Sequence, residues 1–197
     1  MNLNNTSEAG GANAVRPEAA KFMDPKAVIE KLEILAGSVV ADFGCASGYF
    51  SLPVAEKIGE EGVVYCLDIL PQCIETVESQ AKAKGITNII AKRANIEKEG
   101  GSKLPDSSCD WIIIKNVLFQ NKDKEIILEE AKRVLKDSGN VLIIEWSGEN
   151  FSLGPVRELR ISKESLLELV SKIGLILKKE IAVSDFHYGV VLSKLTK

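Results

Sequence analysis

The feature that most constrains the fold of this chain is a short apolar run at residues 39–43 that leads directly into a loop of small residues. Asp42 lies near the end of the run, and Gly44, Ala46 and Gly48 follow at alternate positions. A strand that ends in glycines lets a ligand approach the backbone closely, and the helix that follows offers unpaired N–H groups. The stretch therefore predicts a strand, a loop and a helix that together form a ligand site.

Apolar runs of strand length alternate with segments whose apolar residues recur at helical spacing, as far as about residue 146. This alternation favours a parallel sheet with helices on both faces and right-handed crossovers. The expected strands cover residues 38–43, 63–68, 87–93, 111–115 and 141–146, and the expected helices between them cover residues 48–58, 71–84 and 122–135.

Further elements flank this alternating region. A first helix is expected between Asp24, its cap, and Gly37, and another is expected after Ser162. The last two strand patterns, at residues 175–183 and 186–195, have no helix between them and should pair as an antiparallel hairpin at the edge or centre of the sheet. The predicted fold is α/β: a Rossmann-like doubly wound, mostly parallel seven-stranded sheet with a C-terminal antiparallel hairpin and helices on both faces.

The composition fits one globular domain, because 45% of the 197 residues are hydrophobic and 27% are charged. A net charge of −3 gives no sign of a nucleic-acid-binding surface, and no apolar run reaches membrane-spanning length. We expect residues 1–20 to be a flexible tail, residues 21–197 to form the domain, and the irregular stretch at residues 147–161 to be a mobile cover over the site. A cytoplasmic protein, monomer or homodimer, is the simplest interpretation.

The spacing of the small residues decides between kinds of cofactor. A dinucleotide-binding fingerprint needs the pattern G-x-G-x-x-G, and starting from Gly44 this chain has Ala46 and Tyr49 at the second and third positions. A tyrosine at the third position obstructs the close packing of helix on strand that a glycine permits. A phosphate-binding P-loop would need Gly-Lys-Ser/Thr, which is also absent. The loop therefore disfavours both an NAD-dependent enzyme and a P-loop site.

The stretch from Asp42 to Gly48, Asp-x-Gly-x-Ala-x-Gly, resembles the first motif of the class I S-adenosyl-L-methionine (SAM)-dependent methyltransferases, with Ala46 in place of the usual middle glycine. The resemblance is to small single-domain members of the type 11/25 kind and covers about residues 21–195. Further matches follow in the order of the family: Asp68 at the end of the second strand, residues 94–96 after the third, residues 104–110 before the fourth and residues 133–139 before the fifth.

This resemblance implies that the chain binds SAM and releases S-adenosyl-L-homocysteine (SAH). SAM carries a sulfonium, a free amino acid and a nucleoside, but no phosphate. Asp68 would accept hydrogen bonds from both ribose hydroxyls, while Ile69 would lie against the adenine and Asn95 would bond to its edge. The residues expected to contact the cofactor are Asp42, Gly44, Cys45, Ala46, Gly48, Asp68, Ile69, Asn95, Ile96 and Asn116.

Methyl transfer from SAM requires little catalysis by side chains, because the sulfonium is already an activated leaving group. The protein has to align the acceptor, the methyl group and the sulfur and to exclude water, and no base is obligatory. His187 and Asn116 are the catalytic candidates, although a lone histidine is often a structural residue. The candidates for contact with the acceptor lie at the carboxyl ends of strands: Gln120, Trp146 and Tyr188.

The segment after the fourth strand, residues 115–120, bears on the acceptor. It lacks the Pro-Pro-Tyr that family members modifying exocyclic amines of bases or of glutamine carry after their Asn or Asp. This argues against methylation of nucleic-acid bases, and we expect a small-molecule acceptor. A second interpretation is a SAM-binding protein without turnover, such as a regulatory or partner subunit.

The cysteines give no sign of a metal site. Cys45, Cys66, Cys73 and Cys109 form no CxxC pair, and the chain has a single histidine. Neither a zinc framework nor another metal centre is therefore expected. Methylation of arsenite would need several thiolates around the metalloid. Because Cys45 and Cys66 are expected to be structural and Cys73 to lie on a surface helix, that activity is not favoured.

Overall fold

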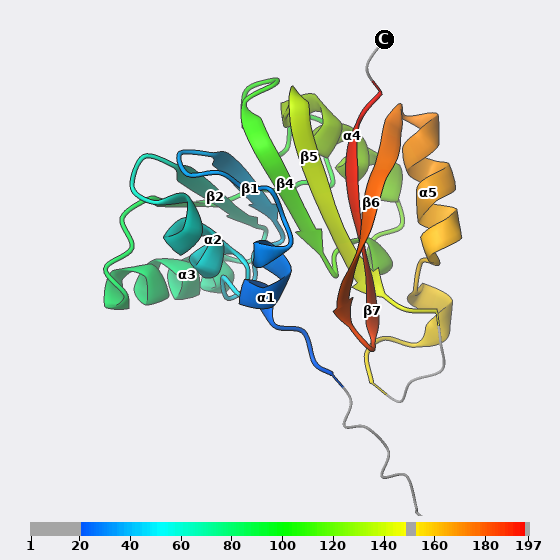
Figure 1. The fold of residues 1–197 in the computed structure, drawn as a ribbon, viewed down its shortest axis with the longest axis horizontal. Coiled ribbons are helices and arrows are strands. Elements are labelled where there is room, and N and C mark those ends of the chain that lie inside the picture. Colours follow the sequence, from blue (N-terminus) through cyan, green and yellow to red (C-terminus); the bar gives the residue numbers. More distant parts are fainter. Residues whose placement is uncertain (1–20, 149–152, 196–197) are drawn as a thin grey trace, which may run out of the picture.

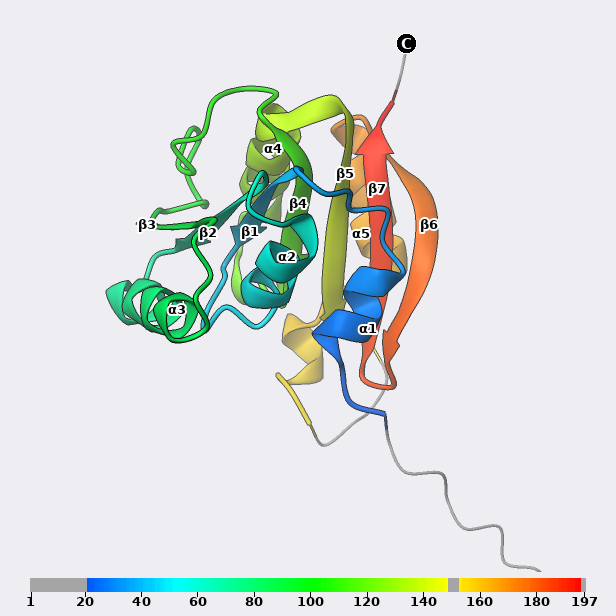
Figure 2. The same cartoon turned by 60° about the vertical axis from the view of Figure 1, so that its left-hand side comes forward.

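Seven strands form one sheet in the computed structural model, which describes residues 21–148 and 153–195. They are β1 (Val39–Phe43), β2 (Val63–Asp68), β3 (Ile89–Arg93), β4 (Cys109–Lys115), β5 (Leu135–Trp146), β6 (Leu175–Ser184) and β7 (His187–Lys194). The spatial order is β3-β2-β1-β4-β5-β7-β6 (Figures 1 and 2). The first five strands pair in parallel, and β7 pairs antiparallel with both β5 and β6. The predicted fold class is confirmed, with β6 at the edge and β7 inside the sheet.

Five α-helices of the described residues pack on the two faces of this sheet. α1 (Pro25–Glu30), α2 (Ser51–Ile58) and α3 (Pro71–Ala83) cover one face, and α4 (Lys124–Val134) and α5 (Lys163–Lys172) cover the other (Figures 1 and 2). Two short 3-10 helices lie in loops, η1 (Leu118–Gln120) after β4 and η2 (Arg157–Leu159) after β5.

Each face of the sheet has its own apolar core, and β4 shows why. Successive side chains of a strand point to opposite faces. Ile112 and Ile114 therefore join the cluster under α4 and α5, while Trp111 and Ile113 join the cluster under α1 and α2. All four side chains are buried. A strand covered on both faces must be apolar throughout, and this explains the unbroken apolar run in the sequence.

Side chains cap two of the helices as predicted. The Asp24 carboxylate accepts a hydrogen bond from the backbone N–H of Lys26 at 3.0 Å, at the start of α1. The Ser162 hydroxyl accepts one from Ser165 at 3.1 Å, at the start of α5. Each cap satisfies one backbone donor that a helix N-terminus leaves open.

Three element boundaries differ from the expected ones by more than two residues. α1 ends at Glu30, because Leu32 and Ile34 reach the core from an irregular segment instead of a continued helix. α2 begins only at Ser51, since Gly48 has a φ of +81° that no α-helix contains. β5 begins six residues earlier than expected.

The early start of β5 comes from a local irregularity in its pairing with β4. Leu135 pairs with Cys109, and the next pair joins Asn140 to Trp111, so that the residues between Leu135 and Asn140 bulge out of the ladder. Part of the turn expected at residues 133–139 is in this way drawn into the strand.

A buried carboxylate fastens the loop before β4 to α4. Glu130 is 2% exposed and accepts hydrogen bonds from the backbone N–H groups of Gly100 (3.0 Å) and Ser102 (2.9 Å). The Ser102 hydroxyl and the Arg133 guanidinium donate to the same carboxylate. Burial by itself raises the pKa of Glu130, but the hydrogen bonds from Arg133 and Ser102 outweigh it and lower the pKa to about 2.

The tail predicted at residues 1–20 lies outside the described residues. The segment predicted as a mobile cover, residues 147–161, lies outside them at positions 149–152. In the part that is described, the Arg160 guanidinium donates to the carbonyls of Ser147 (3.0 Å), Leu153 (2.8 Å) and Pro155 (3.0 Å). Within residues 21–148 and 153–195, no helix has both the length and the apolar character needed to cross a membrane.

Candidate active site

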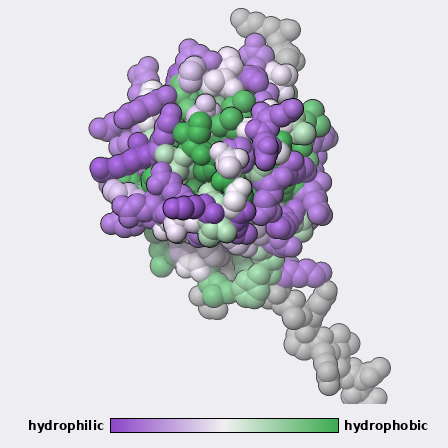
Figure 3. Space-filling view, turned by 90° about the vertical axis from the view of Figure 1, so that its left-hand side faces the viewer, coloured by the Kyte–Doolittle hydropathy of each residue, from purple (hydrophilic) through white to green (hydrophobic). Residues whose placement is uncertain are grey.

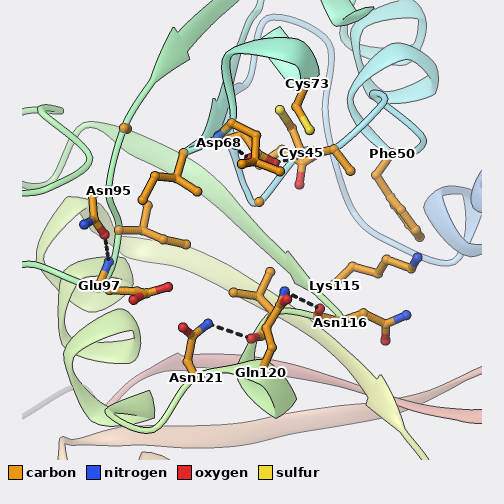
Figure 4. Close-up of a pocket in the computed structure, with 18 of the residues that line it drawn as sticks. Cys45, Phe50, Asp68, Cys73, Asn95, Glu97, Lys115, Asn116, Gln120 and Asn121 are labelled. Carbon is orange, nitrogen blue, oxygen red and sulfur yellow. Dashed lines mark hydrogen bonds between the residues drawn. The ribbon is translucent and has the colours of Figure 1, made fainter. Parts of the chain in front are cut away.

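The candidate site lies where the order of the strands reverses, between β1 and β4. In a doubly wound sheet this reversal leaves a crevice beyond the carboxyl ends of the strands. A cavity of about 430 Å³ occupies that position, and it is lined by residues that follow β1, β2, β3 and β4 (Figure 4). The β2–β3 end of the sheet faces the viewer in Figure 3, where hydrophilic side chains surround a hydrophobic area. Ile69 and Leu70 at this end are exposed and also line the cavity.

The loop after β1 is built from three residues with left-handed backbone. Gly44, Ala46 and Gly48 have φ values of +78°, +48° and +81°. Glycine adopts this conformation freely, whereas alanine adopts it at some cost in strain. A side chain at Gly44 would also clash, because its Cβ would lie 2.6 Å from Cγ2 of Val117. The exposed methyl group of Ala46 lines the cavity, at the position where the family usually has glycine.

Asp68, the last residue of β2, is held by the backbone on both carboxylate oxygens. Oδ2 accepts from the N–H of Ala46 at 3.0 Å, and Oδ1 accepts from the N–H of Leu70 at 2.9 Å. Each oxygen keeps a further lone pair for a ligand. The first contact also ties the loop after β1 to the end of β2. Asp68 therefore presents an oriented carboxylate to the cavity.

Asn95, which follows β3, is oriented in a similar way. Its Oδ1 accepts from the N–H of Glu97 at 3.0 Å (Figure 4), and this local turn leaves the Nδ2 donors without a partner among the described residues. The cavity wall beside Asn95 is apolar, with Ile69 and Ile96. A flat heterocycle can lie against these side chains while its edge meets the amide.

Asn116 and His187, which are far apart in the sequence, meet at the end of β4. Asn116 Nδ2 donates to Nε2 of His187 at 3.1 Å. The imidazole proton consequently lies on Nδ1, which donates to the Ser184 hydroxyl at 2.9 Å. The Trp146 ring packs on the imidazole with 4.1 Å between centroids. Asn116 Oδ1 is buried and has no hydrogen-bond partner among the described residues.

The imidazole of His187 is held in its neutral form. Burial, together with the positive charges of Lys115 and Arg160, lowers its pKa to about 4. We therefore predict that the single histidine of this chain shows no titration between about pH 5.5 and pH 8. The chemical shift of its Hε1 proton, followed by NMR across this range, checks the prediction. An inflection near the ordinary pKa of about 6.5 would contradict the packing described here.

Glu145 is a second buried carboxylate, directly behind the site. It is 0% exposed, and its Oε1 accepts from the N–H of Leu118 at 2.7 Å, which holds η1 in place. Its Oε2 has no partner among the residues described. Burial raises the pKa of Glu145 to about 7, and burial likewise raises the pKa of Asp42 to about 6.

The structure gathers most of the residues predicted from the sequence around one cavity. All the residues expected to contact the cofactor line this cavity except Gly48. Gly48 instead allows the chain to turn, because its φ is positive and a side chain there would press against Leu52 and Val77. Gln120 also lines the cavity. His187, Trp146 and Tyr188 do not, and the described residues of the segment 147–161 do not either. His187 reaches the cavity through Asn116, and the Tyr188 hydroxyl donates to the carbonyl of Ile161 at 3.0 Å.

Sequence reasoning missed several side chains that line the cavity, among them Tyr49, Phe50 and Lys115. Tyr49 and Phe50 lie between the loop and α2, where the apolar pattern predicted only helix. Lys115 could have been noticed in the sequence, because a charged residue directly follows the buried apolar run at residues 111–114.

Each cysteine is a free thiol in the structure. Cys45, Cys66 and Cys109 are buried, and Cys45 and Cys73 line the cavity. Burial and the nearby carboxylate of Asp68 raise the pKa of Cys73, so that its thiolate is disfavoured. Within the described ranges, no three residues among His, Cys, Asp and Glu form a group that could hold a metal ion.

Comparison with known proteins decides what kind of domain carries this site. The methyltransferase domain family matches residues 34–180 of the chain. The chain belongs to this family. The loop from Asp42 to Gly48, which resembles the first motif of the class I methyltransferases, lies at the reversal of the strand order.

Two curated methyltransferases illustrate the relationship. The demethylmenaquinone methyltransferase of Geobacillus stearothermophilus is 29% identical over 122 residues, which are 62% of this chain and 51% of that protein. The aklanonic acid methyltransferase DauC of Streptomyces sp. (strain C5) is 33% identical over 95 residues, 47% of this chain and 42% of that protein. The chain spans about half the length of the curated relatives it matches.

A solved structure extends the likeness to nearly the whole methyltransferase fold. The SAM dependent methyltransferase from Aquifex aeolicus superposes with a TM-score of 0.79 at 24% identity, covering 87% of this chain and 89% of that chain. The family and the fold together confirm the prediction of a class I SAM-dependent methyltransferase domain.

Proposed function

We propose that this chain transfers a methyl group from SAM to a small-molecule acceptor and releases SAH. The observation that carries the proposal is the oriented carboxylate of Asp68, fixed by Ala46 and Leu70 at the edge of the cavity. A carboxylate in this position suits a vicinal diol, since each oxygen can accept one hydroxyl. A nucleoside with a free ribose, as SAM has, presents such a diol.

The rest of the cavity fits the other parts of SAM. Asn95 and Ile69 are placed to receive a base, and the loop from Gly44 to Ala46 lets the aminoacyl part lie close to the backbone. The volume of about 430 Å³ is within the usual range for a small-molecule site.

In the proposed reaction the protein contributes mainly by positioning the reacting groups. Bound SAM supplies a methyl group on a positively charged sulfur, which needs no further activation. The residues of the chain hold the reacting groups in line and keep water away from them. We assign His187 the task of orienting Asn116, because its Nε2 lone pair is engaged by Asn116 and its pKa is about 4. Gln120, which lines the same cavity, is assigned to the acceptor.

The small-molecule acceptor is supported by the relatives, whose names specify demethylmenaquinone and aklanonic acid. The net charge of −3 favours no polyanion. Trp146 and Tyr188 were predicted to contact the acceptor. Trp146 packs against His187, and Tyr188 donates a hydrogen bond to Ile161, so both are proposed to support the wall of the site.

The test is turnover of SAM by the full chain. Purified protein is incubated with isotopically labelled SAM and fractions of a metabolite mixture, and SAH and labelled product are measured together. Labelled product with stoichiometric SAH supports the proposal. SAM binding without SAH in any fraction would favour the alternative, a SAM-binding regulatory or partner protein, and absence of SAM binding would exclude both.

A further inference from the structure

Lys115 is a half-buried residue of the cavity to which the proposed function assigns no role. Lys115 ends β4 after a run of buried apolar residues, on the same face of the strand as Trp111 and Ile113. Its side chain follows those of Trp111 and Ile113 along this face, beyond the apolar core, and lines the cavity. Figure 4 shows Lys115 beside Phe50 and Asn116, at the side of the cavity opposite Asn95 and Glu97.

No carboxylate neutralises this ammonium within residues 21–148 and 153–195. The contact found for it is with the ring of Tyr49, whose centroid lies 5.5 Å from Nζ. Asp42 and Glu145 attract it from a greater distance, but neither lies close enough to form an ion pair with it. Asp42 accepts the hydroxyl of Ser51 at 2.5 Å, and Glu145 accepts the N–H of Leu118.

Partial removal of an ammonium from water is costly unless an anion compensates for the lost hydration. In agreement with this, burial lowers the pKa of Lys115. The three N–H donors of the ammonium can only be used fully by acceptors that enter the cavity from outside the chain. A lysine in this state is suited to bind an anionic oxygen, which would restore the missing partner.

We propose that Lys115 binds an anionic oxygen of a ligand in this cavity, a carboxylate or an ionised enol or phenol. This inference rests on the proposed function. Two sources have the required chemistry: the aminoacyl carboxylate of SAM, and an acidic group on the methyl acceptor. Both belong at the end of the cavity away from Asp68 and Asn95, where Lys115 lies (Figure 4).

The test compares the full chain with its Lys115→Met and Lys115→Arg variants by calorimetry. The matched control is Lys82→Met, which removes the same charge from an exposed position of α3. Circular dichroism and thermal unfolding establish that each variant is folded. Lys115→Arg keeps the charge and should retain most of the affinity for the anionic probe.

The first arm uses SAM and decarboxylated SAM, which differ by one carboxylate. If SAM is the source of the anion, Lys115→Met weakens SAM binding at least about tenfold and changes the binding of decarboxylated SAM less than about twofold. The second arm uses 1-naphthoate and 1-naphthamide, with and without saturating SAH. If the acceptor is the source, the wild-type chain prefers the naphthoate at least about tenfold, and Lys115→Met removes that preference.

The inference is overturned if Lys115→Met changes neither the affinity for SAM nor the preference for naphthoate. Failure of the proposed function has a different signature, since the wild-type chain would then bind neither SAM nor SAH. The naphthoate arm without SAH remains decisive for Lys115 in that case.

Discussion

Replacing Asp68 with alanine is expected to weaken SAH binding by at least about 100-fold. The reason is the loss of two charge-assisted hydrogen bonds to the ribose, each worth roughly 1.5–3 kcal/mol. The carboxylate is already oriented by the N–H groups of Ala46 and Leu70, so little of this energy is spent on ordering it. Isothermal titration calorimetry of SAH into the wild-type and Asp68→Ala chains measures the effect.

The control for this prediction is Glu78→Ala, which removes the same charge from an exposed position of the adjacent helix α3. It should leave SAH binding unchanged. Because Asp68 also holds Ala46, the thermal unfolding of Asp68→Ala is recorded to show that the fold persists. A folded Asp68→Ala chain that binds SAH within about threefold of wild type would refute the role given to Asp68.

The largest effect on stability is expected at Glu130, outside the cavity. Glu130→Ala should lower the free energy of unfolding by roughly 3–5 kcal/mol, because it leaves Arg133 and the backbone donors of Gly100 and Ser102 without their buried acceptor. Urea unfolding followed by circular dichroism measures this. Glu129→Ala, at the exposed neighbouring position of α4, should change the free energy by less than about 0.5 kcal/mol.

The contribution of Glu130 should also depend on pH in a defined direction. Its pKa is about 2 in the folded chain and has its ordinary value of 4.5 when unfolded. A carboxyl whose pKa is lowered by folding stabilises the chain above its unfolded pKa and loses that contribution as the pH falls toward the folded pKa. The difference between wild type and Glu130→Ala should therefore shrink from pH 5 toward pH 3. A difference that stays constant would contradict the ionised network.

The local sequence pattern was sufficient for the sheet and for the half of the site that belongs to single strand ends. Asp42 and Asp68 lie at the carboxyl ends of β1 and β2, Asn95 follows β3, and parallel strands bring their carboxyl ends to one edge. Helix starts were less predictable, because the left-handed backbone at Gly48 delays α2 although the apolar spacing begins earlier.

The other half of the site depends on register between distant strands, which no local pattern contains. Trp146 and His187 meet because β5 and β7 pair antiparallel in one particular register. The contact of Asn116 with His187 also requires the register between β4 and β5. The unpaired state of Lys115 could not be predicted either, since it depends on which partners Asp42 and Glu145 take.

The central claim is that this cavity binds SAM with its ribose on Asp68. The most direct measurement is a crystal structure of the full chain with SAH. We predict density for SAH in the cavity between the loop after β1 and the end of β4, with both ribose hydroxyls on the Asp68 carboxylate and the adenine beside Ile69 and Asn95. SAH bound elsewhere, or in this cavity with its ribose away from Asp68, would contradict the account.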